Sequence, residues 1–578
     1  MRKPFMEVLS GRSFYLPAAY FLYLFADTTD MKIAIAQINP KVGDISANAL
    51  KIETFARRAE SAGAELTVFP ELALTGYPPS DLLEKQDFIF ENLSALHSLT
   101  KLKLKTALAV GYVDMNPGRK GKGLLNSIAF ISGGKVTAKR AKSLLPTYDI
   151  FDEARYFEPA ATNLPFKFRG ETLGLTICED IWAETSLLPK RFLYKNNPVK
   201  TLRAGNTSIV INISASPYYN GKNAKRTAIL AGLAKKMRAF MIYANQVGAN
   251  DELIFDGNSF ALDPSGRAIG RAKPFEEDLL LVDTCAAPPR PAPLRREGTD
   301  EILSALTVGI KDYFQKLGFK KAVLGLSGGI DSAVVAALAA RALGPENVTG
   351  ALMPSIYTAA RSIKDARALA ANLGIKTEII PIKNIYAEFL KELKAAGPRN
   401  EVSLTMQNLQ ARIRGTILMA LANRNNWLAL TTGNKSEIAL GYCTLYGDTA
   451  GAIAPIADLL KTEVYRLANV INRDAEIIPR AIIKRPPTAE LKPGQKDQDD
   501  LPPYKTLDAV IRLYMEENLT AREITRKGYK ADLVLSILRR IEANEYKRKQ
   551  LPIGLKVTEK SFGYGRKMPI VKDLGYIK

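Results

Sequence analysis

A proline-rich segment, CAAPPRPAPLRREG at residues 285–298, divides the chain into two unlike halves. Proline fixes φ and lacks a backbone N–H donor, so this segment can continue neither a helix nor a sheet. The chain has 578 residues, which is too long for one core because domains average roughly 100–200 residues. We therefore predict one domain over residues 31–284, a linker at residues 285–298 and a second domain over residues 299–578.

Residues 1–30 differ in character from the rest of the first half. An uncharged apolar run, SFYLPAAYFLYLFA, occupies residues 13–26. It is shorter than the about 20 residues that a membrane-spanning helix needs, and no clear signal-peptide cleavage site comes after it. We expect residues 1–30 to be either a loose extension or a stretch that precedes the true start at Met31, and we expect no membrane association.

Hydrophobic periodicity predicts a different fold class for each half. Many short apolar runs between residues 31 and 283 favour a layered α/β domain with extensive sheet. Within it, helical spacing at Ser46–Ala62 predicts a helix with Ser46 as its N-cap. In the second half, short strands such as Ala322–Leu326, Glu378–Ile382 and Trp427–Leu430 alternate with helices. This order predicts a doubly wound, Rossmann-like parallel sheet.

The composition limits the chemistry. The chain has one histidine, His97, and three widely spaced cysteines. They form neither a disulfide framework nor a metal-ligand pattern, which favours a reducing compartment, the cytoplasm. Acid–base chemistry must therefore use carboxylates and lysines. The net charge of +22 is scattered, so we expect a solvated basic surface that attracts phosphate-bearing substrates and does not bind nucleic acid.

The string SGGIDS at residues 327–332 comes directly after an apolar strand and opens a helix. Two glycines at such a turn allow close approach of an anion, and the helix N-terminus supplies free N–H groups. The spacing is not that of a Walker A loop. The predicted ATP contacts in this loop are Ser327, Gly328, Gly329, Asp331 and Ser332.

SGGIDS resembles the signature of the pyrophosphate-loop ATPases, which cleave ATP to AMP and pyrophosphate while they adenylate a substrate. The loop alone does not choose among them. The stretch TGNKSEIALGYCTLYGDTAGAIAPIADLLKTEVY at residues 432–465 resembles NAD synthetases specifically. That resemblance implies ATP-dependent amidation of deamido-NAD⁺ to NAD⁺ through an adenylated intermediate, with Mg²⁺ as cofactor.

The same stretch supplies candidate ligands for these substrates. Thr432 closes a strand at the sheet edge where open α/β folds bind ligands, and we expect it to contact ATP. Glu437 can join Asp331 in holding Mg²⁺. The segment Lys484–Tyr504 is rich in proline and charge, which predicts a long loop that is either functional or disordered. Its second part, PGQKDQDDLPPY at residues 493–504, resembles the mobile acidic loop of the family. The predicted contacts with deamido-NAD⁺ are Lys435, Glu437, Asp448, Arg412, Lys461 and Lys560.

Three sequence motifs in the first half indicate a second reaction, separate from that of the pyrophosphate loop. They are TVFPELALTGYPP with Glu71, KSLLPTYDIFDEARYF with Lys142, and LGLTICEDIW with Cys178. Together they resemble the glutaminase branch of the carbon–nitrogen hydrolase, or nitrilase, superfamily, whose fold is a four-layer α-β-β-α sandwich. The resemblance implies that glutamine supplies the ammonia for the synthetase.

The residue types fit that chemistry. The Cys178 thiolate attacks the amide of glutamine, Glu71 acts as base and then acid, and Lys142 lowers the thiol pKa and stabilises the oxyanion. Glu153 is expected to support this pocket. The predicted glutamine contacts are Tyr148, Glu179, Ser214 and Tyr218.

Two other functions remain open on the residues alone. The ATP site could amidate a different carboxylate, as GMP synthetase does a related job. Alternatively, the basic charge and the pyrophosphate loop could belong to a tRNA modifier, although no RNA-binding motif is recognised. The family resemblance also implies a homo-oligomer.

Overall fold

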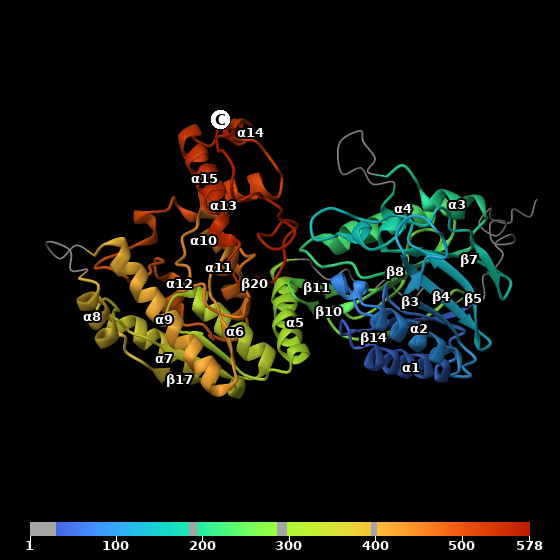
Figure 1. Cartoon of the computed structure of the whole chain (residues 1–578), viewed down its shortest axis with the longest axis horizontal. Helices are drawn as coiled ribbons and strands as arrows, with labels where there is room; N and C mark the ends of the chain where they lie inside the picture. The colour runs from blue at the N-terminus through green and yellow to red at the C-terminus, as the bar shows by residue number, and fades with distance from the viewer. Residues whose placement is uncertain (1–30, 184–193, 286–297, 395–401, 578) are drawn as a thin grey trace, which may run out of the picture.

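The structure is a computed structural model of the chain that describes residues 31–183, 194–285, 298–394 and 402–577. The predictions for residues 1–30 and for most of the linker lie outside the described residues. Two bodies lie side by side, and helix α5 (Thr299–Leu317) stands at their junction (Figure 1).

The first body is a sandwich of two six-stranded sheets. One sheet has the order β14 (Asp278–Asp283), β1 (Lys32–Gln37), β2 (Leu66–Val68), β3 (Ala107–Met115), β4 (Leu124–Ser132) and β5 (Lys135–Ala141). The other has the order β13 (Ala268–Arg271), β12 (Phe260–Leu262), β9 (Phe240–Asn245), β8 (Ile209–Ser214), β7 (Glu171–Ile177) and β6 (Phe166–Phe168). Apolar side chains of both sheets meet in one core, among them Ile33, Val68, Leu175 and Ile211.

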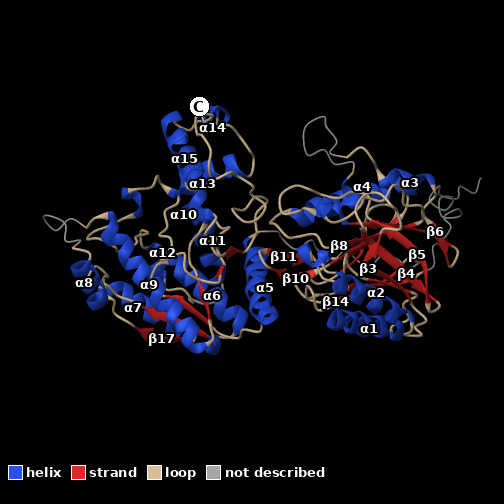
Figure 2. Cartoon of the chain, in the orientation of Figure 1, coloured by secondary structure: helices blue, strands red, loops and turns tan. Residues whose placement is uncertain are grey.

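Helices cover the outer face of each sheet. Helices α1 (Ile45–Ser61) and α2 (Gln86–Thr100) contribute Ile52, Phe55 and Leu96 to the apolar cluster on the first sheet. Helices α3 (Pro198–Ala204) and α4 (Lys222–Met237) cover the second sheet in the same way. The predicted α-β-β-α sandwich is therefore confirmed, and Figure 2 shows its strands enclosed between helices.

The second body is a parallel six-stranded sheet. Its order is β17 (Lys376–Ile379), β16 (Val348–Leu352), β15 (Ala322–Gly325), β18 (Leu428–Leu430), β19 (Ile453–Ala454) and β20 (Ile553–Gly554). Helices α6 (Ile330–Leu343), α7 (Ala360–Leu373) and α11 (Lys461–Ile471) pack with α5 in one apolar cluster. Helices α8 (Lys383–Glu392) and α9 (Leu404–Asn425) contribute to a separate cluster. This is the predicted doubly wound sheet, and its strand order reverses between β15 and β18, where such folds bind ligands.

Two local predictions were wrong. Helix α1 begins at Ile45, and its N-cap is Asp44, whose side chain accepts from the Ala47 backbone N–H at 3.3 Å. A carboxylate two residues before Ser46 therefore caps the helix in its place. Strand β17 starts two residues before the predicted Glu378, because Lys376 and Thr377 already pair with β16.

The two bodies share an apolar interface. Helix α5 packs against the hairpin of β10 (Val247–Asn250) and β11 (Leu253–Asp256), and Ile254 joins Ile302 and Leu306 in one buried cluster. A Cβ on Gly309 would lie 2.7 Å from Leu555 and 3.3 Å from Ile254. Only glycine allows the helix to approach both bodies this closely.

A second contact is made by the 553–565 segment, which begins with β20. The Lys556 backbone N–H donates to the Glu252 carbonyl at 2.9 Å, and the Asn220 N–H donates to the Val557 carbonyl at 3.0 Å. The Lys556 ammonium also pairs with Asp149 at 3.2 Å. The segment therefore joins the edge of the second body's sheet to three loops of the first body.

Among the helices of the described residues, none combines the length and the apolar character that crossing a membrane requires.

Candidate active sites

A buried ion cluster lies where β2 and β5 end in the first body. Glu71 is 0% exposed and Lys142 is 1% exposed. The Lys142 ammonium donates to Glu71 at 2.8 Å and to Glu153 at 2.7 Å. Two further donors hold Glu71, namely the Asn126 amide at 2.7 Å and the Ala215 backbone N–H at 2.9 Å. The cluster thus fixes a carboxylate and a cation in one place before any substrate arrives.

Cys178 comes directly after β7 and lies in the field of this cluster. Its φ of 42° is in the left-handed region, which residues other than glycine rarely adopt. Such strain is typical of side chains held for chemistry. Burial and the Glu71 carboxylate raise the pKa of the thiol well above its ordinary value, and Lys142 acts against them. Sequence reasoning predicted a net lowering by Lys142, but the burial was not visible to it. The resting residue is therefore a thiol whose proton needs an acceptor.

The charge of Lys142 is secured by the same carboxylates. Burial by itself would lower the pKa of its ammonium, but Glu153 and Glu71 raise that pKa well above the ordinary value. Tyr77 also donates to Glu153 at 2.8 Å. Lys142 therefore remains a cation in a site that excludes water.

Asp180 holds the cysteine turn against the lysine loop, and sequence reasoning missed it. Its carboxylate accepts from the backbone N–H groups of Ile177 at 3.0 Å, Ser143 at 2.9 Å and Leu144 at 2.9 Å. It therefore ties the residue before Cys178 to the residues after Lys142. The position of Asp180, two residues after Cys178, is the sequence feature that could have indicated its role.

Glu179 forms a second acidic position beside the nucleophile. Tyr148 and Tyr194 donate to its carboxylate at 3.0 and 2.8 Å. Lys222, at the start of α4, donates from its ammonium to the Pro217 carbonyl at 2.7 Å, and its charge interacts with that of Glu179. Burial lowers the pKa of Lys222 to about 8. Sequence reasoning missed this lysine because its string, YYNGKNAKR, reads as an ordinary basic helix start.

Two predicted glutamine contacts have other neighbours. The Ser214 hydroxyl is buried and donates to the Asn212 side chain at 2.8 Å. The Tyr218 ring packs edge-on against Phe275, with centroids 5.4 Å apart, within the apolar interface of the two bodies. His97, the one histidine of the chain, lies exposed on α2.

A cavity opens in the second body at the carboxyl ends of β15 and β18. Ser327, Gly329, Asp331, Ser332 and Thr432 of the predicted ATP contacts line it. The loop requires glycine at position 328, because its φ is 79° and a Cβ there would collide with the Ser362 carbonyl. Other lining residues include Glu437, Asp448, Lys461, Arg414, Arg485, Thr488, Glu490 and Asp497.

Lys461 connects the two predicted metal ligands. Its ammonium donates to Asp331 and, at 3.0 Å, to Glu437. The Asn434 amide donates to the other oxygen of Asp331 at 2.9 Å. Burial raises the pKa of Glu437 to about 7, although Lys461 opposes the shift. No group of three or more His, Cys, Asp or Glu side chains that could hold a metal occurs in the described part of the chain.

Asp448 also faces this cavity. Its carboxylate accepts from the Thr444 backbone N–H at 2.6 Å, and burial raises its pKa to about 6. Arg412 lies exposed on α9 and donates to the Leu445 carbonyl at 3.3 Å. Its neighbour Arg414 lines the cavity instead. Because residues two apart on a helix point in different directions, the string QARIRG could not say which arginine faces the ligand.

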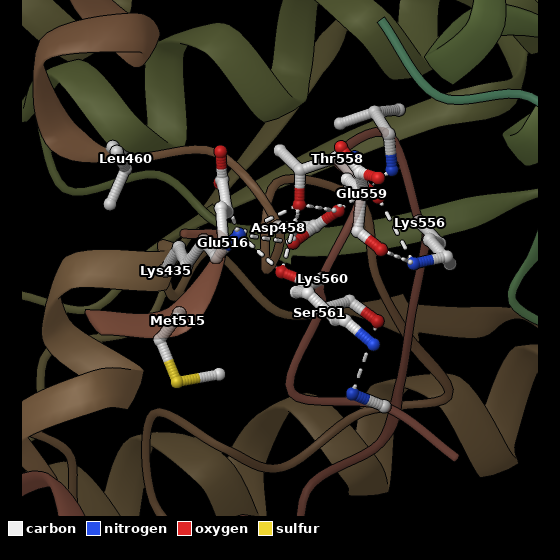
Figure 3. Close-up of polar contacts among 12 residues, drawn as sticks. Lys435, Asp458, Leu460, Met515, Glu516, Lys556, Thr558, Glu559, Lys560 and Ser561 are labelled. Carbon is white, nitrogen blue, oxygen red and sulfur yellow. Dashed lines mark hydrogen bonds and ion pairs between the residues drawn. The ribbon is translucent and has the colours of Figure 1, made fainter. Parts of the chain in front are cut away.

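Lys435 is not among the residues that line the cavity, and its side chain enters a buried polar cluster (Figure 3). Its ammonium contacts Asp458 at 3.0 Å, Glu516 at 3.2 Å and Thr558 at 2.7 Å. It also donates to the carbonyl of Lys560 at 2.7 Å. In this arrangement the Lys435 ammonium ties α10 (Lys435–Leu440) to the 553–565 segment and is engaged away from the dinucleotide. Lys560 takes part only through its backbone carbonyl, its side chain is exposed, and its predicted contact with deamido-NAD⁺ stays a prediction.

Comparison with known families divides the chain in the same way. The carbon–nitrogen hydrolase model matches residues 32–286, and the NAD synthase model matches residues 302–551. Fold and sites thus define a class of protein in which an amide-cleaving hydrolase is joined to an NAD synthase.

The chain belongs to the family of glutamine-dependent NAD(+) synthetases. It is 45% identical to the enzyme of that name from Synechocystis sp. and 42% identical to that from Thermotoga maritima. Each alignment covers 93% of this chain and 98% of the relative.

The most informative solved structure is a glutamine-dependent NAD⁺ synthetase from Acinetobacter baumannii in complex with ADP. It is 36% identical, has a TM-score of 0.73, and the match covers 94% of this chain and 98% of that one. A synthetase from Cytophaga hutchinsonii shares the fold at 21% identity, with a TM-score of 0.81.

Proposed function

We propose that this enzyme converts deamido-NAD⁺ to NAD⁺ with ammonia that it releases from glutamine, and that ATP leaves as AMP and pyrophosphate. The observation that carries the proposal is the buried contact of Lys142 and Glu71 at 2.8 Å beside Cys178. It occurs in a chain whose second body has a cavity at the switch point of a pyrophosphate-loop fold. The family membership supports both halves of the reaction.

The first half-reaction can be derived from the charges around Cys178. Glu71 accepts the thiol proton, and the thiolate attacks the side-chain amide carbon of glutamine. The Lys142 ammonium stabilises the oxyanion that forms. Glu71 then returns its proton to the departing ammonia, and water releases glutamate from the thioester. Asp180 is a positioning residue that fixes the nucleophile relative to Lys142.

Charged groups around the pocket suit an amino acid substrate. Glu179 can pair with the α-ammonium group of glutamine, and Tyr148 and Tyr194 orient this carboxylate. Lys222 can pair with the α-carboxylate, because its ammonium has the sign and the burial that this contact needs.

In the second body, Asp331 and Glu437 fit a Mg²⁺ ion. Magnesium in nucleotide sites is commonly held by one or two carboxylates together with phosphate oxygens. The ion would neutralise the charge that develops on the phosphates. Lys461, freed from the two carboxylates, can then contact phosphate, while Asp448 faces the remaining part of the cavity.

We further propose a cytoplasmic homo-oligomer. In the described part of the chain, Cys178, Cys285 and Cys443 form no disulfide, and proteins without disulfides are typical of a reducing compartment. Large apolar side chains stand exposed on α8 and at the start of α9, including Ile385, Phe389 and Leu404, and a patch of this kind is typical of an interface. Light scattering in solution checks the assembly, and a monomer would contradict it.

The decisive assay measures AMP and NAD⁺ formed from deamido-NAD⁺, with either glutamine or ammonium as the nitrogen source. Cys178→Ala should abolish synthesis from glutamine and leave synthesis from high ammonium intact. Cys443→Ala serves as the matched control and should retain both activities. Loss of both activities in folded Cys178→Ala protein would overturn the division of labour.

A further inference from the structure

One ion cluster in the nucleotide cavity has no role in the proposed chemistry. Glu490 accepts from the Ser362 hydroxyl at 2.8 Å and pairs with the Arg485 guanidinium. Arg485 also donates to the Ser362 oxygen at 2.7 Å. The three side chains form a closed triangle, and all three line the cavity.

This triangle touches the pyrophosphate loop. Ser362 lies in the first turn of α7 and is 1% exposed. Its backbone carbonyl is the atom that leaves no room for a Cβ on Gly328. The Glu490 carboxylate, bonded to the side chain of the same serine, therefore sits beside the loop at which ATP phosphates are expected.

The donors around Glu490 are those that bind phosphate. A guanidinium and a hydroxyl that converge on one oxygen offer an anion site of the kind used for phosphate recognition. Arg414 lines the same wall and donates to the Met353 carbonyl at 3.0 Å. Burial lowers its pKa to about 10, and the charge of Glu490 works against this shift. Glu490 is thus an anion that neutralises cations of the cavity wall.

The other carboxylates of the cavity have different partners. Asp331 and Glu437 hold Lys461, and both suit the proposed metal. Within the described part of the chain, the Glu490 carboxylate hydrogen-bonds only with Arg485 and Ser362. The φ of Glu490, 50°, is in the left-handed region that side-chain-bearing residues rarely adopt. The carboxylate is therefore positioned by these contacts and not by a relaxed backbone.

We propose that Arg485 and Ser362 form a subsite for the outer phosphates of ATP and for released pyrophosphate, which Glu490 fills as an internal anion until the nucleotide arrives. This inference rests on the proposed ATP site of the second body. When ATP binds, its phosphate takes over the guanidinium and the hydroxyl, and the Glu490 side chain withdraws. The carboxylate competes with phosphate, so the protein holds the subsite charge-balanced when it is empty.

The test compares the binding of MgATP, magnesium pyrophosphate and AMP to the full chain by calorimetry. Glu490→Gln removes the competing charge and should tighten ATP and pyrophosphate at least about 3-fold. Arg485→Gln should weaken both at least about 10-fold, whereas Arg485→Lys should recover part of the loss. AMP lacks the outer phosphates and should bind equally to all variants.

Glu476→Gln is the matched control, because this glutamate forms an exposed pair with Arg480 outside the cavity. It should leave all three ligands unchanged. The proposal fails if Glu490→Gln binds ATP no more tightly than the unmodified protein, or if AMP affinity shifts in parallel with ATP. The predicted gain in affinity requires a folded protein, so misfolding cannot imitate it. Failure of the proposed function would appear separately, as ATP binding without NAD⁺ formation from deamido-NAD⁺.

Discussion

The two sites handle charge in opposite ways. In the first body, Glu71 and Lys142 are almost fully buried and their contacts are complete without substrate. In the second body, Asp331 and Glu437 line an open cavity, and each carboxylate is 18% exposed and bonded to Lys461. The first site is therefore organised before glutamine binds. The second must exchange ion-pair partners when its substrates arrive.

The two bodies also differ in what their buried lysines do. Lys142 and Lys435 are 1% and 0% exposed, and each contacts two carboxylates. Only Lys142 lies beside a nucleophile with a strained backbone. Burial and ion pairing alone thus do not identify a catalytic lysine. The presence of a nucleophile beside it, here Cys178, does.

The largest expected effect comes from Glu71→Gln. The amide cannot accept the thiol proton, so glutamate release should fall about 10²–10⁴-fold. Synthesis from ammonium should persist, because the second site does not use this carboxylate. Glu65→Gln, which neutralises a partly exposed carboxylate paired with Arg169, is the control and should act like the unmodified enzyme. A Glu71→Gln enzyme that still hydrolyses glutamine at the normal rate would remove the base from the mechanism.

Lys435→Met tests the structural lysine. It leaves the buried Asp458 without its cation, and breaking a buried pair costs about 3–5 kcal/mol. Glu516, which is 21% exposed, loses the same partner. The urea midpoint of the second body should fall accordingly. Arg480→Met breaks an exposed pair and should cost at most about 1 kcal/mol. Equal losses in the two variants would show that the cluster of Figure 3 contributes nothing special to stability.

Asp331→Asn probes the exchange of partners in the second site. It weakens the proposed metal position and should reduce NAD⁺ formation about 100-fold with either nitrogen source. Glutamate release in the absence of ATP should stay normal. Restoration of synthesis from ammonium alone would instead place Asp331 on the ammonia-supplying side.

The smallest effect concerns pH. The buried Lys222 has a pKa of about 8, so its ammonium, which is present at lower pH, is lost as pH rises through 8. If this charge holds the glutamine carboxylate, KM for glutamine should rise about 5-fold between pH 8 and pH 9. Lys222→Arg keeps its proton throughout this range and should flatten the profile. A rise that persists in Lys222→Arg would assign the titration to another group.

The fold classes and the central chemistry could be predicted from the sequence because both depend on local patterns. The loop SGGIDS after a strand, and Glu71 and Cys178 at strand ends, are visible as strings. The net pKa of Cys178 was not, because burial depends on how two sheets pack. Likewise, the direction of the Lys435 side chain is set by Asp458 and Thr558, which are remote in sequence.

Arg414, Arg485 and Glu490 show the same limit. Arg414 lies two residues after the predicted Arg412, and Arg485 and Glu490 lie in the predicted long loop Lys484–Tyr504, but the choice of side chain depends on helix phase or on loop conformation. Arg412 and Arg414 point in different directions because they are two residues apart on one helix. Glu490 itself has a left-handed backbone, and its side chain meets Ser362. Sequence motifs therefore locate the functional segments, whereas the packing of the folded chain determines which side chains in them face the cavity.

The 553–565 segment also has a consequence for biosynthesis. Its Tyr564 N–H donates to Glu252, a residue translated 312 positions earlier. At about 5–20 residues per second, a ribosome needs about 15–60 s to cover that distance. During this interval α5 can already reach the β10–β11 hairpin, but the contacts that Glu252 and Asn220 make with the 553–565 segment are missing. The junction between the two bodies is therefore completed only near the end of translation, when Leu555 joins the apolar cluster that α5 and Ile254 have begun.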